Sequence, residues 1–338
     1  MSTIQRGQTP RLIACLGAVI AAGCGGGSDE VLTPPPPELL QITSGNQVAV
    51  AGATAMNFSI LDSLRDVPTA AASGAPQARG TADPVKHALG RSVARIARAV
   101  PLGTVSVTEP CPFSGSIAIT LDDRDNNAAP SPGDVLTSVF NDCREEASSL
   151  INGSFVVNIA GYSNSLLSGL FTFSALTVAD ADGTITMSGQ ADLAYAVSSD
   201  SAGTWTTRIE MKVAPAGLGA SISSPQYRET FNYDADFGAQ WTDVSPVAAS
   251  GYSTSVLNGK FLAASLGAKT IVATDPPIRD VWVEDGPQSG AALITGHQSR
   301  LRMTVVSTTT ARLELDANND GTFEETRDIP WSELLPIF

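Results

Sequence analysis

The residues whose types and spacing could do chemistry are acidic, and they lie in two short loops. The first loop, residues 123–134, has oxygen-bearing side chains at positions one, three, five, nine and twelve and a backbone carbonyl at position seven. These spacings are typical of the EF-hand calcium loop, in which oxygen ligands surround a hard cation. The sequence therefore predicts weak calcium binding by Asp123, Asp125, Asn127, Ala129, Ser131 and Asp134.

Two departures from the EF-hand pattern leave another interpretation open for the first loop. Position six is Ala128, where glycine normally permits a sharp turn with positive φ. Position twelve is an aspartate, whose side chain is shorter than that of the usual glutamate. The leading alternative is a polar hairpin loop that turns at Pro132-Gly133. If calcium binds, we expect a dissociation constant of roughly 10⁻⁴ to 10⁻³ M.

The second loop, residues 316–325, begins with the letters D-x-N-x-D-G, and its oxygen ligands would be Asp316, Asn318 and Asp320. Position twelve is Arg327, so the acidic closing ligand of an EF-hand loop is missing. Asn319-Asp320-Gly321 between two short alternating segments, 312–315 and 322–325, predicts a β-hairpin turn. We therefore favour a turn over a metal site here.

Residue counts limit other catalytic chemistry. The chain has two histidines, His87 and His297, and no H-E-x-x-H motif, phosphate-binding glycine loop or zinc-type cysteine spacing. This favours a non-enzymatic role, structural or ligand-binding. The alternative is a glycan-acting hydrolase, because the separation of two catalytic carboxylates cannot be read from a sequence. The formal net charge of −14 argues against a nucleic-acid partner and leaves a protein or glycan partner open.

The first residues predict export. Residues 1–23 are expected to be a signal peptide, because two arginines precede an apolar run, 12–20, that is too short to span a bilayer. The run ends in Ala21-Ala22-Gly23-Cys24, which resembles the lipobox of bacterial lipoproteins. We therefore expect Cys24 to be the first mature residue and to carry acyl chains such as palmitate.

A lipid anchor on Cys24 would hold the chain on a membrane without further contacts. Gly25 follows the cysteine, and by resemblance to enterobacterial sorting this indicates the outer membrane, with the face of the membrane left open. Residues 24–40 contain four consecutive prolines and predict a flexible, then stiff, tether.

Helices are predicted next, within residues 41–104. Met56, Ile60 and Leu64 recur every four residues in a first helix between Ser44 and Leu64. A second helix, residues 83–100, begins with Asp83-Pro84 and carries a basic face.

Residues 105–338 predict a mainly β, antiparallel, sandwich-like body, because short alternating runs such as 116–121 and 154–159 are bounded by turn residues. Two segments ninety residues apart match, Gly161–Phe171 and Gly251–Phe261, each read as a turn leading into a strand. The match indicates an internal duplication, with related units at about 105–200 and 201–338. A final helical turn is expected at 330–334.

Cys111 and Cys143 are the remaining thiols of the expected mature body, and they bracket the first loop. An even pair in an exported protein normally oxidises, so we predict a disulfide bond between them.

Several of these features occur together: the lipobox leader, the cysteine-bracketed hairpin with its Ser131-Pro-Gly-Asp134 turn, the Leu150-Ile-Asn-Gly153 strand start and the closing D-x-N-x-D-G hairpin before a tryptophan. In this combination the chain resembles a group of uncharacterised proteobacterial lipoproteins. The resemblance implies a location in the cell envelope and a β-rich body, and it implies no activity.

Overall fold

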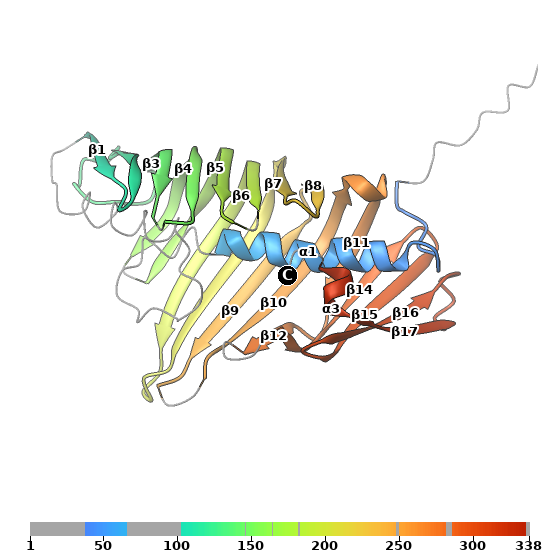
Figure 1. Ribbon diagram of the computed structural model, residues 1–338. Coiled ribbons are helices and arrows are strands. Elements are labelled where there is room, and N and C mark those ends of the chain that lie inside the picture. Colours follow the sequence, from blue (N-terminus) through green and yellow to red (C-terminus); the bar gives the residue numbers. More distant parts are fainter. Residues whose placement is uncertain are drawn as a thin grey trace, which may run out of the picture. The chain divides into compact units, whose positions relative to one another are not determined.

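The computed structural model describes residues 38–65, 103–145, 147–163, 165–181, 183–247, 250–281 and 286–335, with only the backbone for 62–65 (Figure 1). The expected signal peptide, Cys24, most of the tether and the second predicted helix lie outside the described residues. The described chain contains two α-helices, α1 (Gln47–Arg65) and the one-turn α3 (Trp331–Leu334), and a 3₁₀ turn at Ala264–Leu266. Both α-helices were predicted from the sequence.

The rest of the described chain is mainly β, as predicted. Seventeen strands form one antiparallel sheet: β1 (Thr104–Pro110), β2 (Ser114–Asp122), β3 (Val135–Arg144), β4 (Leu150–Ser163), β5 (Leu166–Ala179), β6 (Thr184–Ser199), β7 (Trp205–Ser223), β8 (Arg228–Tyr233), β9 (Gly238–Ser245), β10 (Tyr252–Ala263), β11 (Lys269–Thr274), β12 (Ile278–Val281), β13 (Pro287–Ser289), β14 (Ala291–Gly296), β15 (Ser299–Ser307), β16 (Thr310–Asp316) and β17 (Glu325–Pro330).

The sheet is largely a meander in which each strand pairs with the next one along the chain. The long strand β7 pairs with β9 over its first part and with β8 over its last part, so β8 and β9 act as one interrupted strand. Pairing of β6 with β7 carries the sheet without a break across residue 200. The two units expected at 105–200 and 201–338 are therefore parts of one sheet.

The two matching segments differ in structure. The first segment ends β4 at Ser163 and begins β5 at Leu166, so it contains the expected turn. The second is extended from Tyr252 onward within β10, and the expected turn is absent from its described residues. The internal duplication stays a prediction from the sequence.

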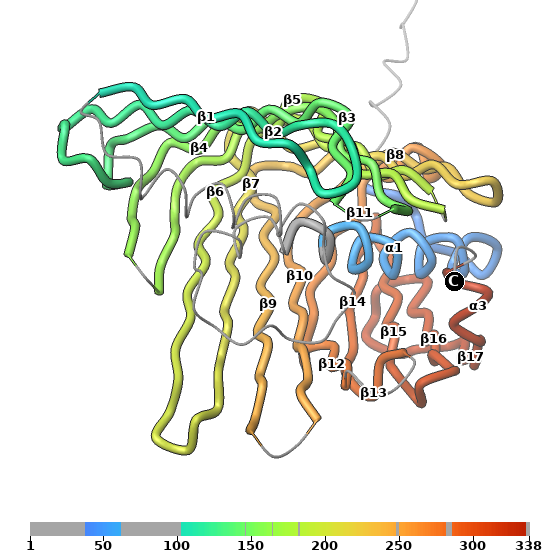
Figure 2. The backbone as a smooth tube through the Cα atoms, turned by 60° about the vertical axis from the view of Figure 1, so that its left-hand side comes forward, coloured from blue at the N-terminus to red at the C-terminus, as the bar shows by residue number. Residues whose placement is uncertain are grey.

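Helix α1 buries most of the side chains that the structure describes for it. It packs against β7, β10, β15, β16 and α3, and it lies along one face of the sheet across many strands (Figures 1 and 2). Residues 53–57 are buried at five consecutive positions, which is more than one helical turn. A helix that buries every side is expected to be apolar or small all round, and Ala53, Ala55 and Met56 fit this expectation. At Gly52, an added Cβ would approach the carbonyl oxygen of Leu334 to 3.1 Å, so glycine permits the close contact with α3.

Two polar residues in the middle of α1, Thr54 and Asn57, are fully buried and make hydrogen bonds. Thr54 donates through its hydroxyl to Val50 O over 2.9 Å, and Asn57 donates through Nδ2 to Ala53 O over 3.1 Å. The hydroxyl of Tyr233 on β8 donates to Asn57 Oδ1 over 2.7 Å. Burial raises the pKa of Tyr233 far above its ordinary value, so this hydroxyl keeps its proton and remains a donor.

Candidate metal-binding loops

The first loop joins β2 to β3, and the neighbouring strand β4 fixes its end. Gly133 N donates to Ile159 O over 2.8 Å, and Ile159 N donates to Asp134 O over 2.9 Å. The chain turns at Pro132-Gly133, where Asp134 N donates to Ser131 O over 3.1 Å. The turn that the alternative interpretation requires is therefore present, and it coexists with the acidic cluster described next.

Three carboxylates of the first loop converge as the spacing predicted. Each of Asp123, Asp125 and Asp134 offers an oxygen atom, and these atoms all lie within 4.8 Å of one another. Asp123 is 3% exposed and Asp134 1% exposed, whereas Asp125 faces solvent. The hydroxyl of Ser131 donates to Asp125 Oδ2 and Asp134 Oδ2, both over 3.0 Å. Four of the six predicted ligands thus share one small volume.

Backbone amides of the first loop bind the carboxylate at position one. Asn127 N donates to Asp123 Oδ1 over 3.1 Å, and Ala128 N donates to Asp123 Oδ2 over 2.8 Å. Asn127 N also donates to Asp125 Oδ1 over 3.1 Å, and Asn127 Oδ1 accepts from Ala129 N over 2.8 Å. Ala128 has φ +65°, the left-handed conformation that glycine normally supplies at position six. The absence of glycine at position six is therefore accompanied by backbone strain at Ala128.

The carboxylates of the first loop accept hydrogen bonds from neutral donors. The basic side chain next to it, Arg124, pairs with Asp122 over 3.2 Å instead of with the cluster. Within the described residues, no ion pair reaches Asp123, Asp125 or Asp134. Desolvation works to raise the pKa of Asp125, but hydrogen bonds from the Ser131 hydroxyl and the Asn127 amide outweigh it and hold the pKa below 3.8.

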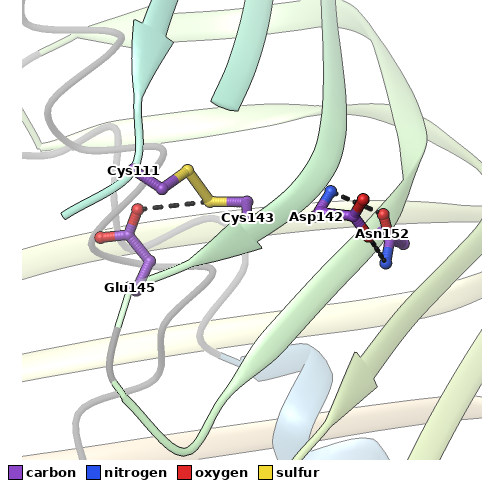
Figure 3. The surroundings of a disulfide bond; sticks show 5 residues. All are labelled: Cys111, Asp142, Cys143, Glu145 and Asn152. Carbon is purple, nitrogen blue, oxygen red and sulfur yellow. Dashed lines mark hydrogen bonds between the residues drawn. A yellow bond between two sulfur atoms is a disulfide. The ribbon is translucent and has the colours of Figure 1, made fainter. Parts of the chain in front are cut away.

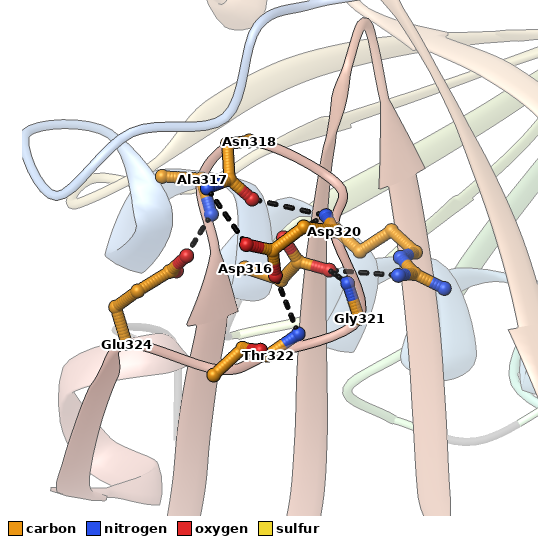
Figure 4. Close-up of polar contacts among 8 residues, drawn as sticks. Asp316, Ala317, Asn318, Asp320, Gly321, Thr322 and Glu324 are labelled. Carbon is orange, nitrogen blue, oxygen red and sulfur yellow. Dashed lines mark hydrogen bonds and ion pairs between the residues drawn. The ribbon is translucent and has the colours of Figure 1, made fainter.

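The second loop joins β16 to β17, which confirms the predicted hairpin. The prediction of a tight turn at Asn319-Asp320-Gly321 is wrong, because the return strand begins at Glu325 and not at Thr322. The intervening residues are held in a wider loop by the carboxylates and amide oxygen of Asp316, Asn318 and Asp320 (Figure 4).

The second loop repeats the hydrogen bonds of the first position by position. Asp320 N donates to Asp316 Oδ1 over 3.1 Å and to Asn318 Oδ1 over 2.9 Å. Gly321 N donates to Asp316 Oδ2 over 3.0 Å, and Thr322 N donates to Asp320 Oδ1 over 2.8 Å. Gly321 occupies position six with φ +96°. The two loops therefore have the same backbone turn, although only the second has the glycine.

Two residues at the second loop, Glu324 and Arg300, were not predicted from the sequence. Glu324, at position nine, offers an oxygen atom that lies within 4.8 Å of those of Asp316 and Asp320, and the acidic letter at that position was an available signal. Arg300 on β15 places Nη2 2.7 Å from Asp316 Oδ2, and Asp316 is 0% exposed. Desolvation works to raise the pKa of Asp316, but Arg300 and the Gly321 amide hold it below 3.8. Only the strand register, which pairs Arg300 with Asp316, reveals this contact.

The predicted disulfide bond is present beside the first loop's hairpin (Figure 3). The Cα atoms of Cys111 and Cys143 are 5.5 Å apart, and the bond spans 32 residues. Both cysteines are buried, and Glu145 Oε1 lies 3.5 Å from Cys143 Sγ. Next to Cys143, Asp142 N donates to Asn152 Oδ1 over 2.8 Å, which ties β3 to β4 at an irregular point of their pairing. The bond thus closes the end of the hairpin opposite the first loop.

The remaining histidine and tryptophan side chains of the described residues include His297, Trp241 and Trp331. His297 lies in the turn after β14, where its backbone N donates to Leu40 O over 2.8 Å. Trp241 is fully buried in the core. Trp331 is half-buried, and its indole Nε1 donates to Ser307 O over 3.1 Å. Trp282 lies outside the described residues.

The chain matches no protein-family model, no curated protein and no solved structure. Among the residues that the structure describes, no helix has both the length and the hydropathy needed to cross a membrane.

Proposed function

We propose that this chain is a lipoprotein of the bacterial cell envelope with a non-enzymatic, structural or ligand-binding role, and that its first loop binds calcium. The convergence of Asp123, Asp125 and Asp134 is the observation that carries the calcium proposal. Two of these carboxylates are almost fully buried, and like charges at such distances repel one another strongly in a medium of low dielectric constant. A divalent cation relieves that repulsion and uses oxygen ligands of this kind.

Calcium suits the first loop better than magnesium does. Its ligands would be carboxylate, amide, hydroxyl and carbonyl oxygens from one short stretch of chain, which calcium accepts with variable geometry, whereas magnesium demands a near-ideal octahedron. The strained backbone at Ala128 and the short side chain of Asp134 both limit affinity. We therefore place the dissociation constant at roughly 10⁻⁴ to 10⁻³ M, the range of extracellular calcium modules.

Thermal unfolding in calcium and in chelator tests this proposal. In about 10 mM calcium, such an affinity adds about 1.4 to 2.7 kcal/mol to the free energy of unfolding, and the melting temperature should rise by a few degrees. Asp125→Ala should abolish the rise. Asp192→Ala, which removes an exposed carboxylate from β6, is the matched control and should keep it. No rise in the native chain, or an equal rise in Asp125→Ala, would mean that the loop is only a turn.

The envelope location rests on the leader and the lipobox, which end at Cys24. Mass spectrometry of the N-terminus of the purified protein should find an acylated Cys24, and Cys24→Ser should move the protein from the membrane fraction to the soluble fraction. Unchanged fractionation of Cys24→Ser, or a mature terminus at another residue, would contradict the proposal. For the hydrolase alternative, Trp241 offers no platform on which a sugar could stack, because its ring is fully buried.

A further inference from the structure

A positively charged side chain from the adjacent strand β15 contacts the second loop. Arg300 lies directly opposite Asp316 in the pairing of β15 with β16, and its guanidinium contacts the carboxylate at position one of the loop over 2.7 Å. In an EF-hand loop that carboxylate is a metal ligand. Here Asp316 is fully buried, and its Oδ2 already accepts from the Gly321 amide and from Arg300.

We propose that the guanidinium of Arg300 takes the place of a metal ion in the second loop and keeps this loop from binding calcium. The acidic groups of this loop, Asp316, Asp320 and Glu324, form a cluster like that of the first loop. A calcium ion approaching Asp316 would meet the positive charge of Arg300 at close range, and a repulsion of that kind is large at a desolvated site. Arginine is suited to the role, because it remains charged and its planar donors match a carboxylate.

The first loop provides the contrast. It has the same four backbone hydrogen bonds, but the described residues give its cluster no basic partner. At position twelve the first loop has the acidic residue Asp134, whereas the second loop has Arg327. The proposal about Arg300 does not depend on calcium binding by the first loop, because it concerns only what occupies the second.

Removing the charge of Arg300 should turn the second loop into a calcium site, with Asp316, Asn318, Asp320 and Glu324 as ligands. The test is made in the full chain carrying Asp125→Ala, so that the first loop does not contribute. In this parent, the melting temperature should be the same in about 10 mM calcium and in chelator. Addition of Arg300→Gln should lower the melting temperature in chelator and create a rise of a few degrees in calcium.

Two variants control for charge and for position. Arg300→Lys keeps a positive charge and should gain no calcium response. Arg302→Gln removes the next outward-facing arginine of β15, which pairs with Glu314 over 2.8 Å and stacks on Phe323, and it should gain none either. If Arg300→Gln does not fold in chelator, calcium should restore its folding.

The proposal is overturned if Arg300→Gln shows no calcium response, or if it stays unfolded in calcium. It is also overturned if the Asp125→Ala parent already responds, because the second loop would then bind calcium beside Arg300. An equal response in Arg302→Gln would show that general loss of positive charge is the cause.

Discussion

The first and second loops have the same backbone turn and neutralise their acids in different ways. In both, amides at positions five and six donate to the carboxylate at position one. Each loop brings three carboxylates together. In the second loop an arginine from the adjacent strand pairs with one of them, whereas in the first loop the donors are neutral. The letters D-x-N-x-D-G, which fit the second loop better, therefore predict the turn, and under our proposal about Arg300 they do not predict a bound calcium ion.

The two hairpins also differ in how they are fastened. The hairpin of the first loop is closed at its far end by the Cys111–Cys143 bond, and the second is fastened through the N-terminal segment. There, Gln47 Nε2 donates to Glu325 Oε2 over 3.1 Å, and the Ser44 hydroxyl donates to Glu325 Oε1. Gln41 Nε2 also donates to Ala317 O over 3.2 Å. The first hairpin is thus closed by a covalent bond, and the second is joined by hydrogen bonds to the segment that leads into α1.

The largest expected effect comes from removing the disulfide bond. The bond closes a span of 32 residues, so Cys111→Ser with Cys143→Ser should lower the free energy of unfolding by on the order of 3 to 4 kcal/mol in the chain-entropy picture. Denaturant unfolding measures this loss.

Hydrogen exchange of the same double variant tests the difference between the loops. The amides of Asn127 and Ala128 should exchange faster relative to those of Asp320 and Gly321, because only the first loop lies within the span of the bond. Equal acceleration in both loops would show that the bond stabilises the sheet as a whole and not its own hairpin.

The contrast between the loops also shows what a sequence can and cannot predict. Spacing alone placed Asp123, Asp125 and Asp134 together, because ligands within twelve residues are joined by a local turn. Counting cysteines predicted the disulfide bond, and recurrence every four residues predicted α1. Arg300 could not be predicted, because its contact with Asp316 follows from strand register, and a shift of one residue would have turned it to the other face. The bond from Tyr233 to Asn57 was missed for a similar reason, since it joins positions 176 residues apart.

The pKa values of Asp316 and Asp125 should respond to different substitutions. Both are held below 3.8, so each carboxylate contributes stability that is present above its unfolded pKa and is lost as the pH falls through the lower folded pKa. Arg300→Gln should raise the pKa of Asp316 and leave that of Asp125 unchanged. Ser131→Ala should raise the pKa of Asp125 and leave that of Asp316 unchanged. Carboxyl carbon NMR titration measures both. If either substitution shifts the pKa values of both carboxylates, the two loops do not titrate independently.

The smallest expected effect comes from exchanging the residues at position six. Ala128 has φ +65° and Gly321 has φ +96° in the same turn, and a Cβ in the left-handed region costs about 1 to 2 kcal/mol. Ala128→Gly removes that strain but adds freedom to the unfolded chain, so a net gain of a few tenths to about 1 kcal/mol is expected. Gly321→Ala should cost about 1 kcal/mol.

An added Cβ on Gly321 would have Arg300 Nη2, 3.8 Å away, as its nearest neighbour, so that cost is conformational and not steric. Chemical denaturation of both variants, in chelator and in calcium, measures the pair. In calcium, Ala128→Gly should gain more than in chelator, because a relaxed turn at position six lets the carboxylates close on the ion with less distortion. Gly321→Ala should lose the same amount in both conditions, because its loop holds a guanidinium that calcium does not replace. If Ala128→Gly raises the free energy of unfolding equally with and without calcium, the strain at position six affects folding and not calcium affinity.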